Sequence, residues 1–247
     1  MLRGFWKLTW VETKVFMREP MGFVTSLAIP VILFIVLGRT MRLGRPEADS
    51  TAQALFNVPI VAALFIAINA VISLVAIISI YREGGILKRL RATPLSPVTI
   101  LSAHVFVKLV FTLVSLGLLV LAGRRFFPGA MDVNLPSFTA ALLLSTLSIL
   151  SLGFVMASLV PTARFAQPIS AGILYPMIAV SGLFFPIERL PSWLQIVAQG
   201  LPTTHAVSLM QGVWDGSGWG AHWGSVVGLM LVFAVCTGLS TRVFRWE

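Results

Sequence analysis

The chain has 247 residues, of which 57% are hydrophobic and only 11% are charged, and its mean hydropathy is +0.93. Soluble domains carry about 25% charged residues, so this composition excludes a water-soluble globular fold and indicates an integral membrane protein. The formal net charge is +9, but the lysines and arginines lie between apolar segments instead of forming one basic module. We therefore expect these residues to meet anionic lipid headgroups rather than nucleic acid.

Residues 1–20 predict an amphipathic helix. Four basic residues are spaced four, seven and four positions apart: Arg3, Lys7, Lys14 and Arg18. At 100° per residue this spacing collects them on a stripe about 60° wide, with aromatic and apolar side chains on the rest of the helix. We expect the helix to lie in the headgroup plane with its basic stripe toward lipid phosphates or cytosol. The alternative is a soluble amphipathic helix that packs on another domain.

Six apolar segments are long enough to cross the hydrocarbon core, which takes about 20 helical residues. They are residues 21–38, 57–80, 100–122, 137–160, 166–185 and 222–241. Around Gly38 there is no small-residue cleavage pattern, so we expect the first segment to be a retained span and not a signal peptide. The sequence predicts an all-α integral membrane protein with one transmembrane domain over residues 1–247.

The positive-inside rule predicts that both termini are cytoplasmic, because this orientation places most lysines and arginines on the cytoplasmic side. Three arginines after the first span are the exception: Arg39, Arg42 and Arg45. Lys108 lies inside the third span. We interpret it as a residue that snorkels to the interface, with a substrate or ion site as the alternative.

Residues 186–220 are apolar enough for a seventh span but are interrupted by Pro191, Gly200 and Pro202. Broken backbone at membrane depth survives only where protein or a water-filled cavity covers it. We therefore predict an outer re-entrant or interfacial helical hairpin before the last span. Pro191 followed by Ser192 is typical of a helix start.

Catalytic and metal-binding signatures are absent from the sequence. It contains no G-x-x-x-x-G-K-[ST] phosphate loop, no G-x-S-x-G elbow and no H-E-x-x-H pair. The three histidines His104, His205 and His222 are isolated from carboxylates in sequence, and we interpret each as a packed or interfacial residue. No acidic residue lies in any predicted span, which disfavours a proton-coupled transporter. We expect no enzyme activity, metal or cofactor in this chain.

The loop at residues 81–97, between the second and third spans, is the most informative stretch. Its apolar residues Ile86, Leu87 and Leu90 are spaced to form one face of a short helix, with basic residues on the other. Pro94 closes the segment, because the residue before a proline resists helix. A short helix presented to the cytosol is suited to docking in a groove on a soluble partner. The alternative is a merely solvated basic loop.

Two groups of short motifs carry a family resemblance. The run E-x-G-x-L followed by L-x-x-T-P-L-S is read at Glu83, Gly85, Leu87, Leu90, Thr93, Pro94, Leu95 and Ser96. The second group is Gly182-Leu183-Phe184-Phe185-Pro186, Leu190-Pro191, Leu201-Pro202 and Thr204-His205-Ala206. In order and spacing these motifs resemble the ABC-2 type permease family, and the resemblance covers essentially the whole chain.

The resemblance implies an exporter subunit that pairs with a second, identical or different permease and with two ATPase subunits, which hold ATP and magnesium. Contacts with the ATPase are expected at Glu83, Gly85, Leu87, Leu90, Arg91, Thr93 and Pro94, with the N-terminal helix as a second cytosolic contact. Such a subunit would lie in a prokaryotic plasma membrane as a multi-pass protein.

We expect spans one, two and five to line the substrate path. Candidate contact residues are Phe34, Asn57, Phe65, Asn69 and Tyr175. Aromatic and apolar lining suits a lipophilic drug or lipid-linked molecule better than a charged solute. The alternatives from other classes are a stand-alone channel or secondary transporter that needs no ATPase, and a membrane enzyme.

Overall fold

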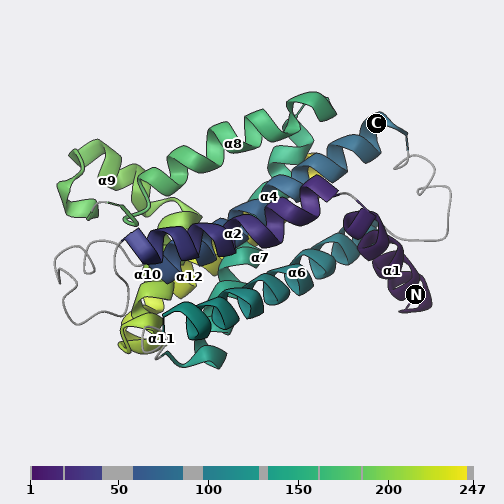
Figure 1. The fold of residues 1–247 in the computed structure, drawn as a ribbon. Coiled ribbons are helices and arrows are strands. Elements are labelled where there is room, and N and C mark those ends of the chain that lie inside the picture. Colours follow the sequence, from purple (N-terminus) through teal and green to yellow (C-terminus); the bar gives the residue numbers. More distant parts are fainter. Residues whose placement is uncertain are drawn as a thin grey trace.

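The computed structural model describes residues 2–18, 20–40, 58–85, 97–127, 133–160, 162–184 and 186–243. Every regular element in these residues is helical (Figure 1). The longer helices are α1 (Leu2–Arg18), α2 (Pro20–Thr40), α4 (Val58–Glu83), α6 (Pro97–Phe126), α7 (Leu135–Leu159), α8 (Ala163–Ala179) and α12 (Trp223–Val243). The shorter elements are η1 (Ile187–Arg189), α9 (Ser192–Gln199), α10 (Pro202–Trp214) and α11 (Gly218–Ala221).

Four helical segments are long and apolar enough to cross a membrane. They are Ile60–Glu83, Ser102–Phe126, Leu135–Leu159 and Trp223–Ser240. The two other predicted spans fall on α2, whose apolar stretch is Ser26–Thr40, and on α8, which has 17 residues. All-helical architecture and four candidate spans are therefore established, and the six-span arrangement stays a prediction.

Helix α8 ends earlier than the predicted fifth span, which was placed at residues 166–185. The helix stops at Ala179, and residues 180–184 form turns and bends. Gly182 has a φ of +86° in this turn, a left-handed conformation that a helix does not contain and that glycine adopts at low cost. The apolar run continues past this point, so hydropathy alone placed the boundary too late.

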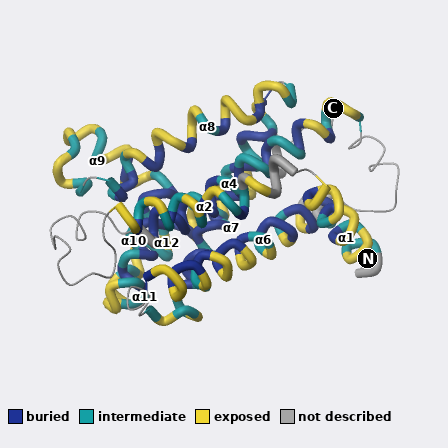
Figure 2. Tube along the Cα trace, in the orientation of Figure 1, coloured by how far each residue is buried: buried dark blue, intermediate teal, exposed yellow. Residues whose placement is uncertain are grey.

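Helix α4 is the centre of the bundle and packs against α2, α6, α7 and α8. Its apolar residues surround the helix, which is the pattern of a helix buried on all sides. A Cβ at Gly153 of α7 would lie 2.9 Å from Val71 Cγ1, so the glycine allows α7 to approach α4 closely. Figure 2 shows the buried centre and the exposed outer faces of α8 and α9.

Helices α9 and α10, joined at Gly200 and Leu201, make up most of the predicted hairpin at residues 186–220, which also holds η1 and the start of α11. Helix α9 begins at Ser192 after Pro191, as predicted, and exposes Trp193 and Ile196. Helix α10 is largely buried and packs against α7 and α12. The Thr203 hydroxyl donates to the Met177 carbonyl at 3.0 Å and so joins α10 to the end of α8. The position of this region relative to the membrane stays a prediction.

Candidate functional site

A cavity of about 400 Å³ lies between α2, α4 and α8. On α4 its lining residues follow one another at helical spacing from Phe65 to Ile80, so they share one face of that helix. On α8 the lining residues Gln167, Ala171 and Tyr175 recur every four residues, which also describes one face. Two helix faces from distant parts of the sequence therefore form opposite walls of one cavity.

The cavity wall is neutral, with a few hydrogen-bonding groups set in apolar surface. Its hydroxyl and amide side chains are Ser26, Asn69, Ser73 and Gln167, and its aromatic side chains are Phe65 and Tyr175. The described residues that line it include no charged side chain. Such a wall can hold an apolar body and orient it through a small number of hydrogen bonds.

Three of the predicted path residues meet at this cavity: Phe65, Asn69 and Tyr175. Phe34 does not line it, because its side chain is fully buried against the Phe127 ring, with centroids 5.4 Å apart. That contact belongs to a separate apolar cluster formed by α2, α4 and the end of α6. Asn57 lies outside the described residues.

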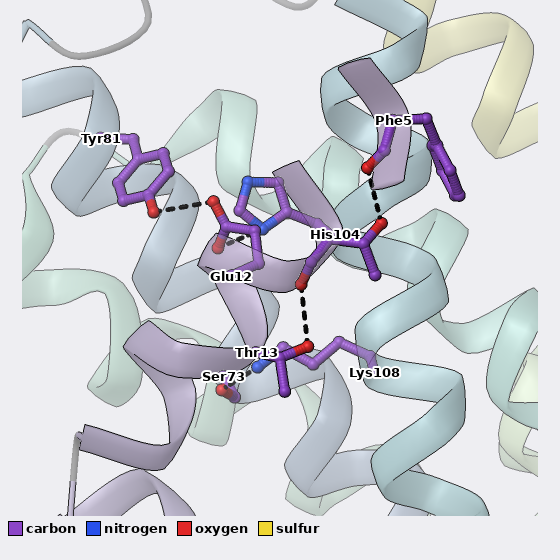
Figure 3. Close-up of polar contacts among 8 residues, drawn as sticks. Phe5, Glu12, Thr13, Ser73, Tyr81, His104 and Lys108 are labelled. Atoms are coloured by element: carbon purple, nitrogen blue, oxygen red, sulfur yellow. Dashed lines mark hydrogen bonds and ion pairs between the residues drawn. The ribbon is translucent and has the colours of Figure 1, made fainter. Parts of the chain in front are cut away.

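A second polar cluster, which we call the α1 anchor, consists of Glu12, Tyr81 and His104 (Figure 3). The Glu12 carboxyl accepts a hydrogen bond from the Tyr81 hydroxyl at 2.9 Å, and its second oxygen lies 3.3 Å from His104 Nδ1. Glu12 is only 5% exposed. A buried carboxylate is stable only when it is paired, so the anchor fixes α1 against both α4 and α6.

Burial raises the pKa of the Glu12 carboxyl above its usual value, and the Tyr81 hydrogen bond and the charge of Lys108 oppose this rise. Lys108 was expected to reach the interface with its amine exposed, and instead its side chain is buried. Its side chain is 6% exposed, its amine donates to the Ser73 hydroxyl at 2.6 Å, and it lies 4.2 Å from the centre of the Phe16 ring. Helix α1 covers the amine, which the position of Lys108 in an apolar segment does not reveal.

Ser73 lies between the cavity and the α1 anchor. It lines the cavity and accepts the hydrogen bond from Lys108, and both residues line a small pocket together with Glu12 and His104. The anchor was not predicted from the sequence, although one signal for it exists. Glu12 lies about 150° around the helix from the middle of the basic stripe, so it is an acid on the apolar face of α1. His104 is a packed histidine, as expected, and Glu12 is its partner.

The basic stripe of α1 has the predicted exposure. The side chains of Lys7, Lys14 and Arg18 are exposed, and the side chain of Arg3 is outside the described part of the helix. Trp6 and Trp10 are exposed as well. Exposed indoles beside basic residues suit the boundary between headgroups and acyl chains.

Of the residues predicted to contact an ATPase, the structure describes Glu83 and Gly85. One carboxylate oxygen of Glu83 accepts a hydrogen bond from the backbone N–H of Ala163 at 2.9 Å. Gly85 has a φ of +66° and ends α4 in the left-handed conformation common at helix ends. The other predicted contact residues lie outside the described part of the chain: Leu87, Leu90, Arg91, Thr93 and Pro94.

Comparison with known proteins gives two findings. The sequence profile of the family described as "ABC-2 type transporter" matches residues 3–214. The inner membrane transport permease YhhJ of Escherichia coli is 27% identical over 166 residues, which are 66% of this chain and 44% of that protein. The permease of the same name from Shigella flexneri has the same identity and coverage. The chain thus spans less than half the length of the curated relatives it matches.

Proposed function

The chain belongs to the ABC-2 type transporter family as a permease subunit, and we propose that it exports a neutral, lipophilic or lipid-linked substrate through the cavity between α2, α4 and α8. It is a multi-pass membrane protein whose role is transport rather than catalysis. In our proposal ATP and magnesium bind to separate ATPase subunits, two of which serve a pair of permeases.

The uncharged cavity is the observation that carries this proposal. Its volume of about 400 Å³ lies within the usual range for small-molecule sites, about 300–1,000 Å³. A charged solute would lose its hydration there, which is costly, and no described lining residue carries an opposite charge to replace it. A neutral molecule with an apolar body could bond to the amides of Asn69 and Gln167 while its body contacts Phe65 and Tyr175.

Docking of the ATPase is assigned to residues 83–94, with the N-terminal helix as a second contact. This loop follows α4, which forms one wall of the cavity. Both termini are then cytoplasmic, with the basic stripe of α1 at the inner leaflet, where anionic lipids attract lysine and arginine. A second copy of the permease would complete the transport path.

Substituting Asn69 with aspartate tests the choice of substrate class. The change places a negative charge in the cavity with almost no change in shape, so ATP-driven transport of a neutral lipophilic dye into inverted membrane vesicles should fall about tenfold or more. Asn134→Asp is the matched control, because Asn134 caps α7 away from the cavity and aspartate caps equally well. Equal transport by both variants would contradict the cavity assignment.

The ATPase partnership can be tested by purifying the intact chain from its native membrane in mild detergent. We expect an ATPase subunit to co-purify with the wild type and to be lost from a Leu87→Asp, Leu90→Asp variant, because both changes put charge on the predicted apolar docking face. Recovery of no nucleotide-binding protein with the wild type would contradict the proposal.

The second candidate function is a stand-alone, proton-coupled transporter. The buried Glu12–His104 pair favours it, because buried carboxylates and histidines form the proton relays of such proteins. This function requires transport by the purified chain alone, driven by a proton gradient and abolished by Glu12→Gln. ATP-dependent transport that survives Glu12→Gln would exclude it.

A further inference from the structure

The last turn of α4 is bonded to the ends of two other helices. Arg82 points to the end of α7, where its guanidinium donates to the carbonyls of Ala157 at 3.1 Å and Ser158 at 3.5 Å and also to the carbonyl of Val160. The neighbouring Glu83 points to the start of α8, where it accepts the Ala163 N–H at 2.9 Å. These contacts join residues about 80 positions apart in the sequence.

Neither helix supplies a hydrogen-bond partner of its own for these backbone carbonyl and N–H groups. In a continuous helix the Ala157 carbonyl would receive the N–H of residue 161, but Pro161 has no N–H. Ala163 is the first residue of α8, so its N–H has no acceptor within the helix. Arg82 and Glu83 supply the missing donor and acceptor from another helix.

The charges also have the favourable sign at each end. A helix carries partial negative charge at its C-terminus and partial positive charge at its N-terminus. The Arg82 cation lies at the C-terminus of α7, and the Glu83 anion lies at the N-terminus of α8. Exchanging the two residues would reverse both interactions without changing the net charge of the protein.

Helix α8 forms one wall of the cavity, and Gln167 lines that wall one turn after Ala163. Figure 1 shows α8 running alongside α4. The segment that we assign to ATPase docking begins at Glu83 itself, so the contact with the start of α8 adjoins the docking loop. A displacement of that loop therefore acts on the start of α8 through hydrogen bonds and not only through apolar packing.

We propose that Arg82 and Glu83 form a transmission clamp, which passes movement of the loop after α4 to the α7–α8 junction and so to the cavity wall on α8. The inference rests on the proposed function, because it needs an ATPase that moves the loop. It gives Glu83 a role inside the permease that differs from contact with the ATPase, and it adds Arg82, which the sequence motifs do not include.

A cysteine reporter on the cavity wall can test the clamp. Cys236, the single native cysteine, is replaced by alanine and Gln167 by cysteine, and the complex with its co-purified ATPase is placed in lipid nanodiscs. The rate of labelling by a water-soluble maleimide is measured without nucleotide and with ATP plus vanadate. With the clamp intact we expect the two rates to differ by about 2- to 30-fold, which is the range of typical coupling energies.

The decisive variant exchanges the two residues, Arg82→Glu with Glu83→Arg. Because Glu83 also belongs to the docking segment, co-purification of the ATPase and ATP hydrolysis are measured first, and in the assembled complex we expect a labelling rate that no longer depends on nucleotide. The matched control exchanges two adjacent, exposed residues of η1, Glu188→Arg with Arg189→Glu. Its labelling rate should depend on nucleotide as that of the parent does. If the exchanged clamp variant also responded as the parent does, the inference would be overturned while the proposed function stood.

Two further outcomes are informative. A parent complex whose labelling rate ignores nucleotide would overturn the proposed function and, with it, the clamp. If the exchanged variant does not assemble, Arg82→Lys and Glu83→Gln decide the question. A lysine ammonium does not reproduce the planar, forked guanidinium, so a reduced response in Arg82→Lys supports the clamp, and undiminished responses in both variants overturn it.

Discussion

The two ends of the bundle are held together by different kinds of side chain. At the end that carries α1, the contacts between helices use ionisable groups: Glu12 with Tyr81 and His104, Arg82 with the end of α7, and Glu83 with the start of α8. At the opposite end, which carries α9 and α11 (Figure 1), His222 lies between the hydroxyls of Ser208 and Ser217 at 3.0 and 3.1 Å.

A second hydrogen bond at the α11 end is also neutral, and the charged contact there, Arg39 over the Phe126 ring, is exposed. The Trp219 indole donates to the Ser137 hydroxyl at 2.7 Å and joins α11 to the start of α7. Partly buried charged contacts are costly to break, because a charged group left unpaired in apolar surroundings loses far more free energy than an unpaired neutral hydroxyl does. The at least partly buried contacts of Glu12 and Arg82, at the end where we propose that the ATPase acts, should therefore cost more to break than the hydroxyl contacts at the α11 end.

The largest effect on stability should come from removing a charged contact. Arg82→Ala leaves carbonyls at the end of α7 without a donor, so the free energy of unfolding should fall by about 2–4 kcal/mol. Thermal unfolding in detergent, followed by tryptophan fluorescence, measures this change. Arg124→Ala is the control, because Arg124 is exposed near the end of α6 and its loss should cost under about 0.5 kcal/mol. Equal losses of unfolding free energy in the two variants would contradict this prediction, because the contacts of Arg82 would then stabilise the protein no more than an exposed arginine does.

The opposite end should respond most to added volume. A Cβ at Gly212 would lie 2.0 Å from a ring carbon of His222, so Gly212→Ala should destabilise the protein by about 1–3 kcal/mol through overpacking. Gly224→Ala, in α12, is the matched control, since a Cβ there meets nothing within 4 Å and alanine favours helix. A Gly212→Ala variant as stable as the control would mean that His222 is not held as described.

The smallest effect is a pH dependence at the α1 anchor. Because the pKa of Glu12 is raised above its ordinary 4.5, the folded chain keeps this proton over a pH range in which the unfolded chain has released it. The contribution of Glu12 to the free energy of unfolding therefore falls as pH rises from 4.5 through the folded-state pKa. Thermal unfolding of wild type and Glu12→Gln between pH 4.5 and 7 measures it, and a difference that does not change with pH would contradict the burial of Glu12.

Local sequence patterns predicted the helical architecture well. Long apolar runs indicated the four candidate spans, the spacing of Lys7, Lys14 and Arg18 indicated α1, and Pro191 marked the start of α9. These features depend on neighbours within one or two turns, so the sequence carries them directly. Phe65, Asn69 and Tyr175, predicted to contact the substrate, lie together on the cavity wall, and their part in transport stays a prediction.

Features that depend on helix rotation and on distant partners were not predicted. Phe34 faces Phe127 and not the cavity because of the rotation of α2, which its nearly uniform apolar sequence does not specify. Glu12 and Arg82 find partners about 70 and 75 residues away. Only Pro161, which removes a helix N–H, gave a local sign that the end of α7 needs an outside donor.

The most direct test of the central claim is transport by the purified chain in liposomes, with and without its co-purified ATPase, using a neutral lipophilic dye. The account predicts dye movement only when the ATPase, magnesium and ATP are all present. Comparable movement by the chain alone, driven by a proton gradient, would contradict it and support the stand-alone transporter.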